Sequence, residues 1–215
     1  MVFRKGLLPT SLLPTFLLGA AALLSGCLAT GGAPADLARY DFAPGAQAVG
    51  SVLALRGVDV IAPSWLAGPG MQYRLNFADG GRRESYATSR WVAPPAELLE
   101  NSLRQRLVAG TRRSATADCR LRVELDEFIQ VFDQPQESRA VVNLRLALLP
   151  GRGELVLARR SLALSKSAGA EARSGAAALS ARATELGGTG EQWLQQLAAD
   201  DAQLGERCRG TATTG

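Results

Sequence analysis

The sequence predicts an α+β domain with two layers, in which a mainly antiparallel sheet is covered on one face by two helices. Several segments alternate apolar and polar residues, as half-buried strands do. Two longer segments repeat apolar residues every three or four positions, as helices packed on a sheet do. The expected order along the chain is strand, hairpin, helix, three strands and helix.

The first expected elements are a strand and a hairpin. An apolar run over residues 52–61 suits a strand, and Pro63 ends it. The clearest alternation in the chain follows over residues 71–77. Residues 78–81 have the Asp-Gly composition of a hairpin turn. Residues 82–91 are therefore expected to return as the second strand of a hairpin.

The first expected helix opens at Pro94-Pro95, because proline is tolerated in the first helical turn. Leu99, Leu103 and Leu107 recur at every fourth position and form an apolar stripe. Acidic residues come early in this segment and arginines come late, which complements the helix dipole. Gly110 is expected to end the helix.

Three further strands are expected at residues 120–132, 140–148 and 155–164, joined by short turns. Such an order predicts an antiparallel meander. In the first of these strands the alternation loses phase near Glu127-Phe128, which predicts a bulge or a fully covered end. In the third strand the alternation slips around Arg159-Arg160.

The last expected helix covers residues 171–186, and an apolar stripe continues around Trp193 on residues 191–199. Gly187-Gly188-Thr189-Gly190 lies between the two stretches and is expected to weaken or break the helix. This glycine run lacks the lysine and the spacing of a phosphate-binding P-loop.

The N-terminus has the features of a secretory signal. Arg4 and Lys5 precede an apolar run that closes with Leu24-Ser25-Gly26-Cys27. This ending resembles the lipobox of bacterial lipoproteins, in which the cysteine sulfur accepts a diacylglyceryl group. A transmembrane anchor is the alternative, because the run is about long enough to span a bilayer. The loop-like composition after the motif favours cleavage before Cys27 and lipidation of its sulfur.

The domain boundaries follow from this reading. The expected segments are a signal peptide (1–26), a lipidated flexible tether (27–44), one domain (45–200) and a C-terminal tail (201–215). Residues 38–42 could already start the domain. Leu28 follows the cysteine, whereas an Asp at that place commonly retains such lipoproteins at the inner membrane. The resemblance therefore implies the periplasmic face of the outer membrane.

The composition excludes several functions. The chain contains no histidine, which excludes Ser-His-Asp and Cys-His catalysis and histidine-ligated metal sites. Paired carboxylates could still catalyse, but the acidic residues mostly alternate with apolar ones, as on the solvent face of a sheet. The 24 basic and 20 acidic side chains give no reason to expect nucleic acid. We therefore expect no enzyme, no cofactor, no bound metal and no nucleic-acid partner.

With Cys27 used for lipid, Cys119 and Cys208 remain as an even pair. The periplasm is oxidising, so we predict a disulfide between them. Two buried free thiols are the alternative.

A few apolar residues are candidates for contact with a partner or a lipid. Trp65 and Leu66 lie in the loop before the hairpin and could form an exposed contact. Alternatively, Trp65 could fold back as a lid on the core. Tyr73, Tyr86 and Trp91 could be core aromatics of the hairpin or could line a groove.

From about Tyr40 to Ala199, the chain resembles the ABC-type transport auxiliary lipoproteins, which include the lipoprotein of the paraquat-inducible operon. The resemblance rests on four stretches that follow one another behind the lipobox. They are Val58–Pro63 with Met71–Arg74; Tyr86 and Trp91 with Pro94-Pro95, Leu98-Leu99 and Leu103; Leu121–Leu125 with Phe128 and Phe132; and the helix that ends at Trp193-Leu194.

The resemblance implies a docking role beside an ABC transporter whose periplasmic subunit carries an MCE (mammalian cell entry) domain. Such systems move phospholipid or other lipids between the inner and outer membranes. The implied partners are the MCE subunit, the membrane through the lipid anchor, phospholipid and further copies of this chain. The alternative is a small lipoprotein for outer-membrane assembly, acting in lipopolysaccharide export or as a secretin pilot. Neighbouring genes would discriminate between the two.

Overall fold

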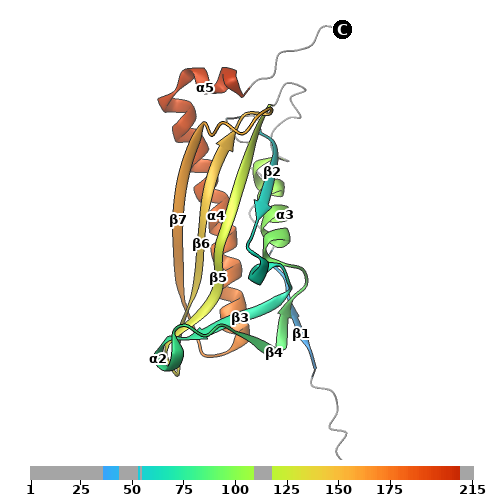
Figure 1. Ribbon diagram of the computed structural model, residues 1–215, viewed down its shortest axis with the longest axis vertical. Helices are drawn as coiled ribbons and strands as arrows, with labels where there is room; N and C mark the ends of the chain where they lie inside the picture. The colour runs from blue at the N-terminus through green and yellow to red at the C-terminus, as the bar shows by residue number, and fades with distance from the viewer. Residues whose placement is uncertain (1–35, 44–52, 54, 109–117, 209–215) are drawn as a thin grey trace, which may run out of the picture. The chain divides into compact units, whose positions relative to one another are not determined.

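The centre of the fold is the long strand β5 (Cys119–Gln134). β6 (Glu137–Leu149) pairs with it antiparallel, and β7 (Ala158–Ala168) pairs antiparallel with β6. The computed structural model describes residues 36–43, 53, 55–108 and 118–208, and Figure 1 shows these three strands side by side. The predicted meander is confirmed.

The other edge of β5 is shared by two strands that run parallel to it. β2 (Leu55–Ile61) pairs with its first half, and β3 (Gly70–Leu75) pairs with its second half. β3 also pairs antiparallel with β4 (Glu84–Trp91), and β1 (Ala38–Tyr40) lies parallel to β4 at the end of the sheet. Together these make one mixed seven-stranded sheet, in which the two longest ladders are antiparallel.

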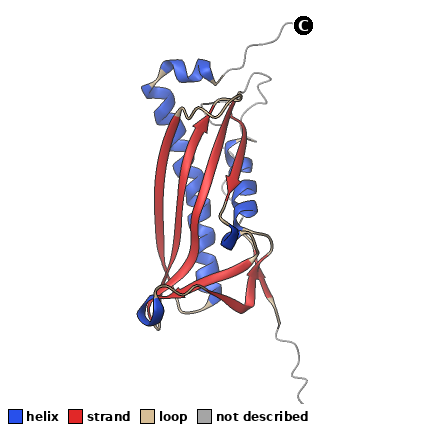
Figure 2. Cartoon of the chain, in the orientation of Figure 1, coloured by secondary structure: helices blue, strands red, loops and turns tan. Residues whose placement is uncertain are grey.

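Two long helices pack on one face of this sheet, as expected (Figure 2). α3 (Pro95–Leu107) packs against β2, and α4 (Ala172–Asp200) packs against β5, β6 and β7. The leucine stripe of α3 is buried, from Leu99 to Leu107. The α+β fold class is therefore confirmed. None of the helices in the described ranges has both the length and the apolar composition needed to cross a membrane.

α4 is continuous through the glycine run, so the expected break is wrong. Gly187 lies where α3 crosses α4, and a Cβ atom there would come within 2.5 Å of the Arg106 Cδ atom. Gly190 faces Leu107 at the same crossing. Gly187 leaves room for the Arg106 side chain to lie against α4, and the packing gained at this crossing offsets the low helix propensity of glycine. Arg106 then reaches Glu191 on α4, with 3.0 Å between Nη2 and Oε2.

Two strand ends also differ from expectation. β3 stops at Leu75, and a single helical turn, α2 (Asn76–Asp79), replaces the tight hairpin turn. At the start of this turn, the Asn76 side chain donates a hydrogen bond of 3.0 Å to Asp133 of β5. Likewise, β7 begins at Ala158, and no register shift occurs near Arg159 because the residues before Ala158 lie outside the strand. The loss of phase in β5 is confirmed as a register shift between Leu125 and Glu127.

Both ends of the folded part extend beyond the expected domain. At the N-terminal end, β1 is already part of the sheet, which matches the alternative in which residues 38–42 start the domain. At the C-terminal end, α5 (Ala202–Arg207) buries Leu204, and Cys208 is bonded to β5. The signal peptide, Cys27, most of the tether and Gly110 lie outside the described residues.

Candidate functional site

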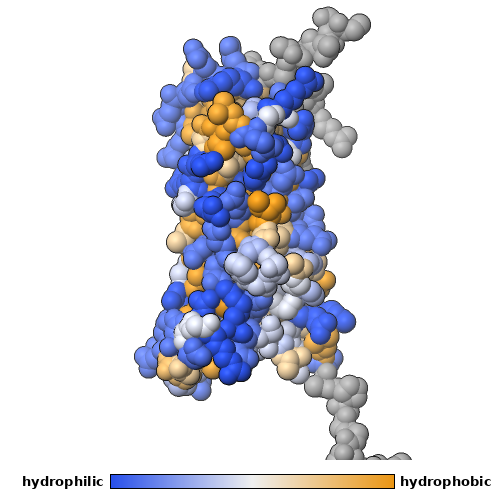
Figure 3. Space-filling view, in the orientation of Figure 1, coloured by the Kyte–Doolittle hydropathy of each residue, from blue (hydrophilic) through white to orange (hydrophobic). Residues whose placement is uncertain are grey.

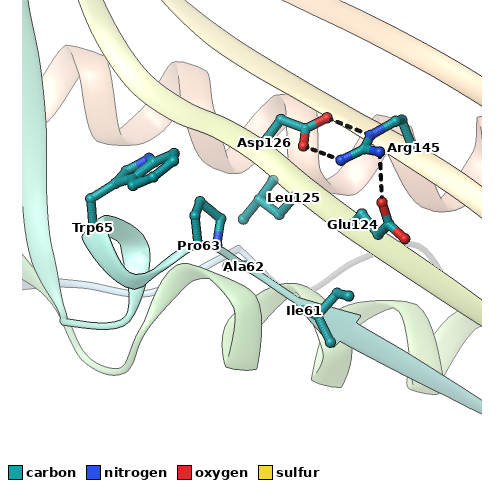
Figure 4. A pocket seen from close by; sticks show the side chains of 8 residues that line it. All are labelled: Ile61, Ala62, Pro63, Trp65, Glu124, Leu125, Asp126 and Arg145. Carbon is teal, nitrogen blue, oxygen red and sulfur yellow. Dashed lines mark hydrogen bonds and ion pairs between the residues drawn. The ribbon is translucent and has the colours of Figure 1, made fainter.

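A surface groove forms where the two parallel partners of β5 separate. β2 last pairs with β5 at Ile61 and Glu124, and β3 first pairs with it at Tyr73 and Gln130. The connection between β2 and β3 spans the interval and leaves a groove of about 420 Å³. Figure 4 shows its lining residues: Ile61, Ala62, Pro63, Trp65, Glu124, Leu125, Asp126 and Arg145.

One wall of the groove is apolar and open to solvent. Ile61 is 51% exposed and Trp65 is 54% exposed, although both are large apolar side chains. Trp65 lies in a single 3-10 turn, η2 (Ser64–Leu66), whose next residue, Leu66, is buried in the core. The buried leucine anchors the turn while the indole stays at the surface.

The opposite wall is charged. Arg145 on β6 forms two hydrogen bonds with Asp126, of 2.7 and 3.0 Å, and lies 2.8 Å from Glu124. The hydrogen bond to Asp126 and the negative charges of both carboxylates raise the pKa of Arg145. Since two carboxylates share one guanidinium, this wall carries one excess negative charge.

Hydrogen bonds fix the backbone that presents Trp65. The Gln72 side chain donates to the Trp65 carbonyl at 2.5 Å, and Arg83 donates to the other side-chain atom of Gln72, Oε1, at 2.8 Å. Arg83 also binds Glu127 at the bulge of β5, at 2.6 Å, and Arg74 binds the same carboxylate at 3.2 Å. The position of Trp65 is therefore tied to the central strand.

The five candidates for contact with a partner or a lipid, Trp65, Leu66, Tyr73, Tyr86 and Trp91, lie in different surroundings in the structure. Trp65 is exposed, so the lid alternative is wrong. Leu66 and Trp91 are buried, and Trp91 packs edge-on against Phe42 and Phe128, so neither can touch a partner directly. Their expected role as contacts is wrong because the core of the domain requires both side chains. Tyr73 is half-buried, as a core aromatic of the hairpin would be.

Tyr73 belongs to a second cluster, in which its ring lies 4.6 Å from that of Tyr86. The Tyr86 hydroxyl donates to the Gln130 side-chain oxygen at 2.9 Å, and the Gln130 amide donates to Ser138 at 2.8 Å. Burial raises the pKa of Tyr86, and the neighbouring Tyr73 adds to the shift. The Gln130 side chain also lies against Gly175 of α4. We interpret this partly buried polar cluster as structural.

Cys119 and Cys208 form a disulfide, with 4.7 Å between their Cα atoms and a separation of 89 residues. The Asp118 amide also donates to the Cys208 carbonyl at 2.9 Å. The bond joins the start of β5 to the end of α5. In the described ranges, no three His, Cys, Asp or Glu side chains come together as a metal site.

Sequence reasoning missed Ile61, Asp126 and Arg145 as members of one site. Ile61 reads as part of an apolar strand, and the charged residues read as a solvated strand face. No local pattern brings them together, because the groove exists only where two parallel ladders on β5 diverge.

No model of a protein family matches this sequence, and no curated protein does. Two crystal structures share its fold. One, of an uncharacterized protein, gives a TM-score of 0.56 at 15% identity and covers 74% of this chain and 99% of the other. The second, of protein XCC0632 from Xanthomonas campestris, bears the family name DUF330; its TM-score is 0.54 at 20% identity, and it covers 78% of this chain and 99% of the other. At these identities the likeness shows the shared fold alone.

Proposed function

We propose that this chain is a lipid-anchored periplasmic protein of the outer membrane that docks an MCE-type ABC lipid transport system. The observation that carries the proposal is a lipobox-like leader ahead of a fold shared with a DUF330 protein over 99% of that protein's chain. DUF330 is the family name of the paraquat-inducible lipoproteins that the sequence resembles. The solved structures share only the fold with this chain, and the proposal adds that this chain also shares the docking role of those lipoproteins.

Other features support the same role. A disulfide is typical of proteins in an oxidising compartment such as the periplasm. The absence of histidine from the whole chain favours a binding function over catalysis. A surface groove with an exposed tryptophan suits contact with another protein.

The lipid anchor is tested by producing the chain with its own leader in bacteria fed radioactive palmitate. The unaltered chain should carry the label, Cys27→Ser should lose it, and the Cys119→Ser/Cys208→Ser control should keep it. Leu28→Asp should move the labelled protein from outer-membrane to inner-membrane fractions in a density gradient. Label that persists in Cys27→Ser would refute anchoring through this sulfur.

The docking role is tested by purifying the tagged chain from its native membranes and identifying bound proteins by mass spectrometry. An MCE-domain subunit should copurify, and phospholipid should be found in the complex. Recovery of a secretin or a lipopolysaccharide-export protein in its place would favour the outer-membrane assembly role and refute docking to an MCE system.

A further inference from the structure

We infer that the groove along β5 between the end of β2 and the start of β3 binds an extended segment of a partner protein that presents a basic side chain beside an apolar one. The inference rests on the proposed docking function, and it names the docking surface and the chemistry of the partner. It comes from three features of the groove: an exposed and fixed tryptophan, an excess negative charge, and a division into one apolar and one charged wall.

The first feature is the position of Trp65. Its neighbour Leu66 is buried, its carbonyl is held by Gln72, and its side chain nevertheless stays half exposed in the groove that Ile61 also lines. Tryptophan residues account for a large share of binding energy at protein interfaces. Since the backbone is already held, a partner that covers this indole loses little conformational entropy from the loop.

The second feature is the charge of the opposite wall. Arg145 is shared by Glu124 and Asp126, so one carboxylate charge is left without a counterpart in the groove. An arriving Lys or Arg side chain can bind these carboxylates, while an apolar neighbour of that side chain covers Trp65 and Ile61 on the other wall. An acidic segment would instead meet the excess negative charge, which disfavours it.

The third feature favours a peptide over a lipid chain. Figure 3 shows an apolar patch midway along this face with hydrophilic atoms on several sides of it. An acyl chain in the groove would lie against the carboxylates of Glu124 and Asp126 and would strip water from them at a cost. A peptide strand places apolar and basic side chains on the two walls at once.

The inference is tested with short fluorescent peptides and the whole chain, produced with its own leader and purified in nonionic detergent. A peptide of alternating lysine and leucine should bind, as measured by fluorescence anisotropy. Trp65→Ala should weaken binding about tenfold, the usual effect of removing an interface anchor. Glu124→Gln/Asp126→Asn should weaken it several-fold and reduce its dependence on salt.

Matched controls keep the result specific. Phe77→Ala removes another large exposed apolar side chain, and Glu97→Gln removes an exposed carboxylate of α3; neither should change binding. Circular dichroism and thermal melting should show that all variants fold alike. A peptide of alternating glutamate and leucine should bind at least tenfold more weakly than the lysine peptide.

Equal binding to the unaltered chain and to Trp65→Ala would overturn the inference, and so would equal binding of the glutamate and lysine peptides. Displacement of the lysine peptide by lysophosphatidylethanolamine at concentrations below its own micelle formation would assign the groove to lipid and also overturn it. The proposed docking function is judged separately. If an MCE subunit copurifies equally well with Trp65→Ala, docking stands and uses another surface.

Discussion

The two faces of the sheet are built from the same strands but have opposite surroundings. On the face under α3 and α4, β5 and β6 bury residues such as Val123, Leu125 and Leu144. On the open face, their neighbours form cross-strand ion pairs, among them Arg145 with Glu124. The covered face supplies the stability of the domain, whereas exposed ion pairs contribute little and keep the open face soluble.

The groove is an exception to this division. Ile61 and Trp65 are large apolar side chains that stay exposed, and they line the same groove as Arg145 and its two carboxylate partners. The contrast teaches that the groove, where β2 ends and β3 begins along β5, brings exposed apolar side chains close to the ion pairs of the open face. Four substitutions test how far the two faces differ.

Leu144→Ala should have the largest effect, a loss of about 3 kcal/mol in the free energy of unfolding, because it leaves a cavity under α4. Urea denaturation followed by circular dichroism measures it. A loss below about 1 kcal/mol would show that the covered face repacks freely, and would weaken the comparison.

Gly187→Ala should lower the free energy of unfolding by about 1–2 kcal/mol, because its methyl group would meet Arg106 at the helix crossing. Gly188→Ala is the matched control. A Cβ there would lie 3.5 Å from Arg106, in ordinary contact, so the gain in helix propensity should stabilise the protein by about 0.5–1 kcal/mol. Equal effects of the two changes, measured by thermal melting, would exclude close approach as the reason for the glycines.

Tyr86→Phe should lower the free energy of unfolding by about 1 kcal/mol, because the hydrogen bond from the Tyr86 hydroxyl to Gln130 is lost. It should also change the response to alkali. The pKa of Tyr86 is higher in the folded state than its ordinary value of 10.0. The protonated hydroxyl therefore stabilises the folded state fully at pH values below 10.0. This stabilisation is lost as the pH rises from there through the raised pKa. Urea denaturation at several pH values above 10 should show that the free energy of unfolding falls less with rising pH for Tyr86→Phe than for the unaltered chain.

Arg145→Ala should have the smallest effect on stability. The free energy of unfolding should fall by less than about 1 kcal/mol, because the ion pairs of Arg145 with Glu124 and Asp126 are exposed. The small loss should shrink further at high salt. Leu144→Ala is the matched comparison for Arg145→Ala, because Leu144 and Arg145 are adjacent residues of β6 that face opposite sides of the sheet. A loss as large as that of Leu144→Ala would show that the open face also holds the fold together.

Much of the fold could be predicted because its patterns are local. The meander of β5, β6 and β7 follows from alternation within each strand, and α3 follows from its leucine stripe and its opening prolines. The parallel pairing of β2 and β3 with β5 could not be predicted in this way. Which strand lies beside which depends on contacts between distant residues, and alternation says nothing about them.

The sequence by itself determined which side chains are available: one pair of cysteines besides Cys27, no histidine, and strands and helices with one apolar side each. Only the tertiary structure decided that α4 continues through its glycines, that Trp91 is buried, and that Trp65 and Arg145 line the same groove. The physical reason is that propensity and alternation act between near neighbours in the chain. Burial and proximity are set when distant segments pack together, and that packing can override a local preference.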